Sequence, residues 1–185
     1  MAMPHVEVPL TAARFNELAE LGVFPDDLRA ELIDGRVVEM TPIGDRHALC
    51  VRRLTDLFAH TLPADAMMDV QNPVILGEYQ MPQPDLVILR RRADAYPNHP
   101  HAGDILLLIE VADSSLAHDR DTKLLRYAQA GIPEVWLINL PADGFEVYRE
   151  PGDTGYAQVR HAPPGETLTP LHLPGVAVNV ADILK

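Results

Sequence analysis

The spacing of apolar residues along the chain changes near Pro63. Before it, apolar residues recur at helical spacing over residues 10–21 and 45–62, which predicts two amphipathic helices. After it, short apolar runs are separated by turn residues, a rhythm typical of strands. The predicted strands cover residues 67–76, 85–89, 104–111, 134–140, 145–150 and 156–161. A further helix is predicted among them over residues 118–130, with Gly131 as its C-terminal stop.

Turn and cap residues add detail to the first half of the chain. Residues 31–38 read Glu-Leu-Ile-Asp-Gly-Arg-Val-Val, which predicts a β-hairpin with Asp34-Gly35 as its two-residue turn. Thr11 and Asp45 are candidate N-caps, because their side-chain oxygens can accept hydrogen bonds from free N–H groups at a helix start.

The most apolar strand defines the centre of the predicted sheet. Residues 105–109 are apolar at every position, as in a strand that is covered on both faces. The helix over 118–130 and the apolar strand over 135–138 complete a right-handed β-α-β unit with it. Alternating valines over residues 176–180 predict a final edge strand. We therefore expect an α/β protein with a mixed central sheet flanked by helices.

Length and composition fit one domain over residues 1–185, and an apolar content of 47% supports a sizeable core. Cys50 is the only cysteine, so no intrachain disulfide can form, and we expect it in the core of a protein from a reducing compartment. The first ten residues lack the pattern of a signal peptide, and no apolar run reaches the ~20 residues of a membrane span. We expect a cytoplasmic protein without membrane contact.

The charge balance restricts the mode of any nucleic-acid binding. Lys and Arg number 15 and Asp and Glu number 27, which gives a net charge of −12. A protein that coats DNA irrespective of sequence depends on clustered cations, so this class is disfavoured. Contact with nucleic acid would have to be local or assisted by a metal ion.

Three acidic residues occupy positions where a carboxylate is costly. Glu110 ends the most apolar predicted strand, Asp85 opens another, and Glu31 opens the hairpin. A buried carboxylate costs on the order of several kcal/mol unless it is paired, protonated or bound to a metal. If the strands of Asp85 and Glu110 are neighbours, their Cβ atoms can lie about 4.5–5.5 Å apart. Two carboxylates at that separation can share a hard divalent ion such as Mg²⁺.

Lys123 is the candidate cation of the same site. It lies on the predicted helix that follows the strand of Glu110, and Asp119 precedes it by one helical turn, the spacing of an i,i+4 ion pair. If this helix folds back over the sheet, Lys123 approaches the acids. Carboxylates, a metal ion and a lysine together can activate water and stabilise a phosphate.

Each of these residues also has a purely structural interpretation. Asp85 can be a strand-start residue after a proline, Glu110 an acid paired with an arginine, and Glu31 a solvent-facing hairpin residue. Lys123 can be a solvated helix residue. His47 lies one turn into its predicted helix, a position that requires no chemistry.

The order Pro84-Asp85, Glu110 and then a lysine resembles the pattern of PD-(D/E)XK nucleases. More specifically, residues 109–140, IEVADSSLAHDRDTKLLRYAQAGIPEVWLINL, are similar to the Uma-type restriction endonuclease family of bacteria. The similarity covers nearly the whole chain. It extends to ELIDG at residues 31–35, the helix of His47, PDLVIL at residues 84–89 and LPGVAVNVADIL at residues 173–184.

The resemblance implies a restriction-endonuclease-like fold and phosphodiester hydrolysis that depends on Mg²⁺, with Mn²⁺ as a second candidate ion. Asp85, Glu110 and the main-chain carbonyl of Val111 match the metal ligands of the superfamily. Glu31 matches an acid that assists the metal or its waters.

The lysine departs from the superfamily pattern. It usually follows the glutamate by two residues, where this chain has Ala112. Uma-type sequences carry it on the following helix, at the position of Lys123. The resemblance therefore implies that Lys123 orients the attacking water or neutralises charge on the phosphate.

The implied substrate is nucleic acid, with DNA expected. A net charge of −12 repels a polyanion at long range. A homo-oligomer with a less acidic groove between its subunits is expected to relieve this repulsion. Two alternatives stay open: a catalytically inactive module that acts in protein interaction or as an accessory subunit, and a hydrolase of small phosphorylated compounds.

Overall fold

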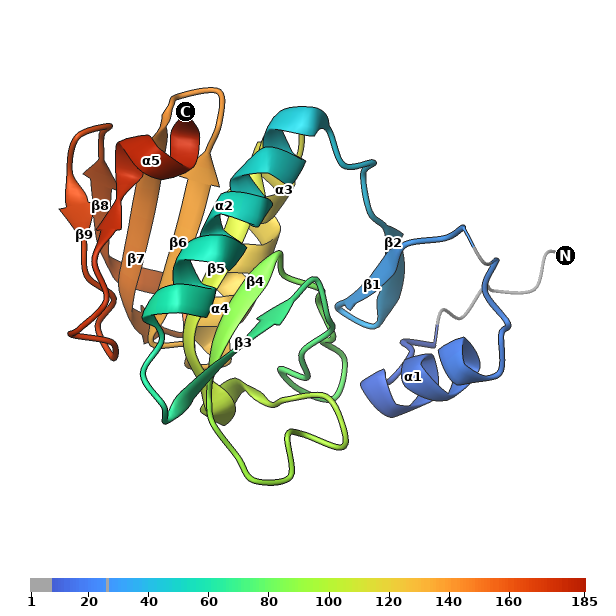
Figure 1. Cartoon of the computed structure of the whole chain (residues 1–185). Helices are drawn as coiled ribbons and strands as arrows, with labels where there is room; N and C mark the ends of the chain where they lie inside the picture. Colours follow the sequence, from blue (N-terminus) through green and yellow to red (C-terminus); the bar gives the residue numbers. More distant parts are fainter. Residues whose placement is uncertain (1–7, 26) are drawn as a thin grey trace, which may run out of the picture.

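A six-stranded sheet forms the centre of the computed structural model, which describes residues 8–25 and 27–185 (Figure 1). The strands lie side by side in chain order, from β3 to β8. Their bounds are β3 Ala66–Val70, β4 Leu86–Arg90, β5 Ile105–Ala112, β6 Glu134–Asn139, β7 Gly144–Gly152 and β8 Gly155–Ala162. All six predicted strands occur, but the first ends early because Gln71 has a left-handed φ of 53°, which interrupts extended backbone.

The predicted β-α-β unit is present in the sheet. β5 and β6 pair in parallel, and the other neighbouring pairs of this sheet are antiparallel. The connection is a helical segment made of α3 (Leu116–His118), η2 (Asp119–Lys123) and α4 (Leu124–Gln129). A regular helix over residues 118–130 is predicted, whereas the observed segment begins earlier and η2 is a π-helical turn. Such wider turns within helices are frequent at functional sites.

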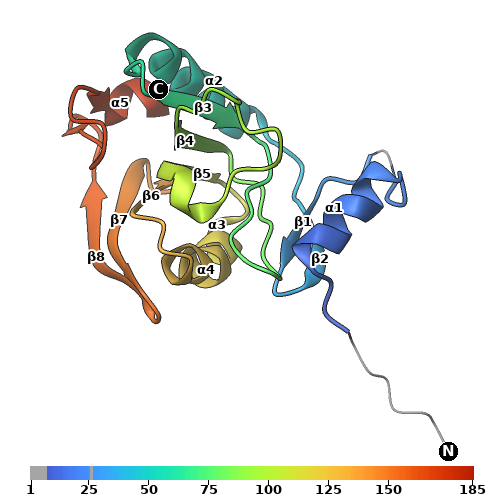
Figure 2. The ribbon, with the colours of Figure 1, turned by 90° about the horizontal axis from the view of Figure 1, so that it is seen from below.

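Helices cover both faces of the sheet (Figure 2). α2 (Asp45–Thr61) and α5 (Val180–Leu184) lie on one face, and α3 and α4 lie on the other. Phe58 and Cys50 of α2 belong to one apolar core, and Tyr127 of α4 belongs to the opposite one. Burial raises the pKa of the Cys50 thiol to about 12, as expected for a core cysteine. The prediction of a mixed sheet flanked by helices is confirmed.

The first two helices differ in how they begin. α1 (Ala12–Glu20) is capped by Thr11, as predicted, and the Thr11 hydroxyl accepts a hydrogen bond from the N–H of Arg14 at 3.2 Å. The predicted cap of α2 is wrong, because Gly44 is the N-cap and Asp45 is already in the first turn. There its carboxylate faces the positive end of the helix dipole. No helix within the described residues combines the length and apolarity that crossing a membrane requires.

The predicted hairpin lies beside the sheet, next to α1 (Figure 1). It consists of β1 (Ala30–Ile33) and β2 (Arg36–Glu39), and Asp34-Gly35 has φ values of 52° and 71°, as a type I′ turn requires. Two backbone hydrogen bonds, of 3.1 and 2.8 Å, join Leu32 to Met81 in the segment that leads to β4. The hairpin is therefore fixed relative to the start of β4.

The end of the chain differs from the predicted edge strand over residues 176–180. Only β10 (Val178–Asn179) is extended, and it pairs with β9 (Thr167–Leu168) in a separate two-stranded sheet. α5 follows at once, because the Asn179 side chain accepts a hydrogen bond from the N–H of Ala181 at 3.0 Å and caps this helix.

The buried carboxylate of Glu146 on β7 gives the stability of the fold a pH dependence. It accepts hydrogen bonds from Asn139 at 3.0 Å and Tyr148 at 2.5 Å, and it pairs with Arg120 of η2. Burial acts to raise the pKa of Glu146, but these bonds to the ionised form outweigh burial and lower the pKa. The stabilisation is therefore complete above the unfolded pKa of about 4.3 and is lost as the pH falls through the lower folded pKa.

We expect Glu146→Gln to reduce the free energy of unfolding by about 1–3 kcal/mol at neutral pH. The loss should shrink as the pH falls below the unfolded pKa of about 4.3 and the native carboxyl also becomes protonated. Urea denaturation followed by Trp136 fluorescence measures both values. The exposed Glu150 is a matched control, and Glu150→Gln should stay within about 0.5 kcal/mol of the native protein. An equal loss of unfolding free energy at both pH values would show that the charge of Glu146 is not what stabilises the fold.

Candidate active site

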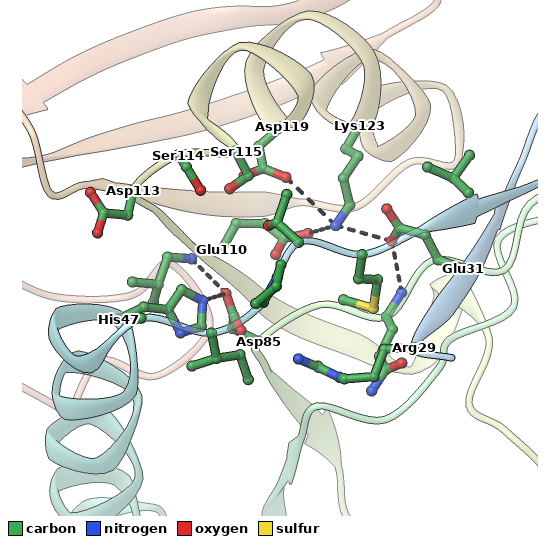
Figure 3. A pocket seen from close by; sticks show the side chains of 18 of the residues that line it. Arg29, Glu31, His47, Asp85, Glu110, Asp113, Ser114, Ser115, Asp119 and Lys123 are labelled. Atoms are coloured by element: carbon green, nitrogen blue, oxygen red, sulfur yellow. Dashed lines mark hydrogen bonds and ion pairs between the residues drawn. The ribbon is translucent and has the colours of Figure 1, made fainter. Parts of the chain in front are cut away.

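One pocket of about 490 Å³ brings the predicted residues together (Figure 3). It lies where the β1–β2 hairpin, the start of α2, the end of β5 and the segment α3–η2 meet. All five residues predicted for the site line it: Glu31, Asp85, Glu110, Val111 and Lys123. The six acidic residues of the lining are Glu31, Glu39, Asp85, Glu110, Asp113 and Asp119. The pocket is therefore strongly acidic.

Neighbouring strands place Asp85 and Glu110 together. β4 and β5 are antiparallel, with Leu86 opposite Ile109, so the register continued by one step sets Asp85 opposite Glu110. Both side chains are buried. The condition for two facing carboxylates, that their strands be neighbours, is met.

The carboxylate of Asp85 is held in the ionised form. Its Oδ2 accepts hydrogen bonds from the N–H of Val111 and from His47 Nε2, each at 2.9 Å, and its Oδ1 accepts from Gln71 at 3.1 Å. Burial acts to raise the pKa of Asp85, yet the contacts with His47, Val111 and Gln71 together lower it. Two carboxylate oxygens offer about four acceptor positions, so one remains beside Oδ1.

The carboxylate of Glu110 lies in a less favourable environment for charge. Burial raises its pKa to about 8, although the ammonium of Lys123 opposes the shift. Lys123 Nζ lies 2.7 Å from Glu110 Oε1, and the Tyr127 hydroxyl donates to the same oxygen. Oε2 is therefore the oxygen through which Glu110 would bind a cation.

Lys123 is buried at the centre of a group of three carboxylates (Figure 3). Besides Glu110, its Nζ lies 3.2 Å from Glu31 Oε2 and 3.7 Å from Asp119 Oδ1. Burial acts to lower the pKa of Lys123, but the three carboxylates outweigh burial and raise it. The lysine is thus a fixed positive charge at neutral pH.

The other two members of this group are anchored by their own elements. Glu31 is buried on β1 and accepts a hydrogen bond from the N–H of Gln83 at 3.3 Å, so it is not the solvent-facing hairpin residue of the structural interpretation. Asp119 begins η2 and accepts from the Ser115 hydroxyl at 2.5 Å. Burial raises the pKa of Asp119 despite the nearby Lys123.

Sequence reasoning missed three residues that contact the two facing carboxylates. His47 and Gln71 bind Asp85, and Tyr127 binds Glu110. His47 carried a signal, because its helix belongs to the family resemblance, but a histidine at a helix start required no role. Gln71 and Tyr127 gave no such signal, since only the tertiary structure brings them to Asp85 and Glu110.

The structure shows how a lysine reaches Glu110 although it does not occupy the usual position of the superfamily pattern. Ala112, at the usual lysine position, is buried in the apolar core beneath α4. Lys123 instead reaches Glu110 from η2. The pocket therefore has a lysine beside its glutamate, supplied by the following helical segment.

The donor set fits a hard divalent cation. Asp85 and Glu110 offer oxygen ligands, the type that Mg²⁺ prefers, and Mg²⁺ is commonly bound by one or two carboxylates while it keeps several waters. Across residues 8–25 and 27–185, no group of three or more His, Cys, Asp or Glu side chains is arranged to hold a metal ion. Two carboxylates with water and phosphate oxygens match the Mg²⁺ pattern, whereas a closed protein cage does not occur.

The chain is thus an α/β protein with a mixed sheet flanked by helices, and a buried acid pair and a lysine lie at one end of its adjacent strands. A family model described as "Putative restriction endonuclease" matches residues 12–181. The chain belongs to this family, Uma2, and the family supports a nuclease function and contact with nucleic acid.

A solved structure gives independent support for the fold. The chain is similar to a "putative nuclease belonging to DUF820" from Anabaena variabilis ATCC 29413, with a TM-score of 0.71 and 16% sequence identity. The match covers 95% of this chain and 98% of the other. No curated protein matches the sequence.

Proposed function

We propose that the protein is a metal-dependent endonuclease that hydrolyses phosphodiester bonds, with DNA as substrate. One observation carries the proposal: in a member of a nuclease family, Asp85, Glu110 and Lys123 meet in one pocket. These residue types, in this arrangement, are suited to water activation and phosphate stabilisation.

Asp85, Glu110 and the Val111 carbonyl are the proposed ligands of Mg²⁺ or Mn²⁺, and Glu31 is the candidate partner of an ion-bound water. When bound, the ion lowers the pKa of a water and polarises the scissile phosphate. Hydrolysis forms a bond between the water oxygen and phosphorus and breaks the bond to the leaving sugar oxygen. The water proton leaves to solvent, and the leaving oxygen gains a proton.

The residues of the chain have distinct tasks in this reaction. Asp85 stays ionised because His47, Gln71 and Val111 donate to it, so a ligand is ready at neutral pH. Lys123 stays protonated among its carboxylates, and its proposed task is electrostatic stabilisation of the phosphate rather than proton abstraction.

The burial of these charges favours an enzyme over an inactive interaction module. Asp85, Glu110, Asp119 and Lys123 are all buried, and buried ion pairs are commonly no more stabilising than apolar residues of similar volume. A purely structural protein gains little from such a cluster, whereas a phosphate-hydrolysing site requires it.

Calorimetric titration with Mg²⁺ and Mn²⁺ tests the proposal without a choice of substrate. We expect the native protein to bind either ion, and Asp85→Asn and Glu110→Gln each to weaken binding at least ~10-fold, because each removes a charged ligand. Asp113→Asn removes an exposed acid of the same pocket and is the matched control, with binding within about threefold of native. Equal effects of all three substitutions would contradict the assigned ligands.

A further inference from the structure

A second cation, Arg29, lines the acidic pocket and has no assigned task. It is half-buried and directly precedes β1, and its carbonyl accepts a hydrogen bond from the N–H of Met40 at 2.8 Å. Residues two apart on a strand point to the same face, so Arg29 shares the pocket-facing side of the hairpin with Glu31. Figure 3 shows Arg29 beside Glu31 and across the pocket from Asp113.

The guanidinium of Arg29 is not neutralised by any described residue, since no hydrogen bond or ion pair of its side chain occurs within residues 8–25 and 27–185. The arginines on the helical segment above the pocket differ in this respect. Arg120 is paired with Glu146, and Arg126 is paired with Asp34. A half-buried arginine without a carboxylate partner is therefore available to an anion.

The charge of the pocket makes such a cation necessary for an anionic substrate. Lys123 is already surrounded by three carboxylates, so it cannot offset the remaining acids of the lining. A bound divalent ion compensates only the site of Asp85 and Glu110. A polyanion that enters the pocket from a protein of net charge −12 needs a further positive contact close to the reacting phosphate.

Resting on the proposed function, we propose that Arg29 binds a backbone phosphate of the nucleic-acid substrate adjacent to the scissile one. Its Cα lies about 6.6 Å from that of Glu31 along the strand, as two residues of extended chain span. Arg29 is thus displaced by about this length from the Lys123–Glu31 contact, and the proposal places the adjacent phosphate beside it. The guanidinium fork matches two phosphate oxygens, a geometry that lysine does not reproduce.

The test is the salt dependence of cleavage by the full chain. The probe is one labelled DNA oligonucleotide, used single-stranded and as a duplex, with Mn²⁺. We expect Arg29→Gln to raise KM about tenfold with kcat changed less than about twofold, because a charge-assisted contact to a non-reacting phosphate is lost. The slope of log kcat/KM against log salt is negative, and its magnitude should decrease by about one, as for the loss of a single phosphate contact. Arg29→Lys should retain most of the slope but only part of the affinity.

Arg52→Gln is the matched control, since Arg52 is exposed on α2, lies outside the pocket lining and also has no partner among the described residues. It should leave KM and the salt slope unchanged. Thermal unfolding of Arg29→Gln should match the native protein, because no described carboxylate loses a partner. A methylphosphonate next to the cleaved bond should raise KM for the native protein but not raise it further for Arg29→Gln.

The outcomes separate this inference from the proposed function. If the native protein cleaves DNA and Arg29→Gln keeps the native KM and salt slope, the role of Arg29 is wrong and the nuclease proposal stands. Equal losses in Arg29→Gln and Arg52→Gln also overturn it, because they indicate long-range charge alone. If the native protein binds divalent ions but neither binds nor cleaves DNA, both proposals fail together.

Discussion

Lys123→Met is expected to reduce the free energy of unfolding by about 3–5 kcal/mol at neutral pH. The substitution keeps an apolar side chain of similar length, but it leaves Glu31, Glu110 and Asp119 buried without their shared cation. The remaining carboxylates repel one another and lie in a poorly solvated pocket. Removing one partner of a buried ion pair is among the most destabilising single changes.

The pH dependence of this loss follows from the pKa of the carboxylates. Burial already raises the pKa values of Glu110 and Asp119, and without Lys123 both should rise further above the unfolded values of about 4. An acid with a raised folded pKa destabilises the fold above its unfolded pKa, and the cost disappears as the pH falls and the acid becomes protonated. Lys123→Met should therefore recover much of its stability between pH ~7 and ~4.5.

Urea denaturation of both proteins at the two pH values measures the effect. Lys185→Met is the matched control, because Lys185 forms an exposed pair with Asp182, and its loss should change stability by less than about 0.5 kcal/mol. A loss in Lys123→Met that is the same at both pH values would show that packing, not charge, is responsible. An unchanged stability would contradict the buried position of the lysine.

The largest effect on catalysis is expected from Asp85→Asn and Glu110→Gln. Each should lower kcat for DNA cleavage at least ~10²–10³-fold, because each removes a proposed ligand that acts on the reacting phosphate. Both replacements keep the shape of the side chain and an acceptor oxygen. Asp85→Asn still offers its amide oxygen to Val111, and Glu110→Gln still offers its amide oxygen to the Tyr127 hydroxyl.

Cleavage rates with saturating Mn²⁺, together with thermal unfolding, separate loss of function from loss of fold. Asp113→Asn tests whether removal of any acid from the pocket has the same effect, and it should stay within about threefold of the native rate. If Asp85→Asn keeps more than about a tenth of the native rate while folded, Asp85 is not a ligand of the catalytic ion.

Much of the secondary structure was predictable from local pattern alone. The apolar run at residues 105–109 required a covered central strand, and Asp34-Gly35 required a tight hairpin turn, because burial and a left-handed backbone are local demands. The final valines illustrate the limit of this reasoning. Their alternation suits a strand, but Asn179 caps a helix within the same residues, and the pattern does not decide between the two.

The members of the candidate site were predictable from the sequence, but the contacts among them were not. Asp85, Glu110 and Lys123 stood out because charged residues beside apolar strands are costly, and the family resemblance named the same positions. His47, Gln71 and Tyr127 did not, because their role is to touch Asp85 or Glu110 from elements far away in the chain. Contacts between such distant elements produce no characteristic residue spacing in the sequence.

The sequence by itself determined the six strands of the central sheet, the hairpin, the family and the candidate acids and lysine, since these depend on periodicity, turn chemistry and motif. The tertiary structure decided which groups share a pocket and in which charge state. A π-helical turn directs Lys123 toward Glu110 and Glu31, and strand register sets Asp85 opposite Glu110. Their pKa values follow from burial and from partners distant in sequence, which only the folded chain supplies.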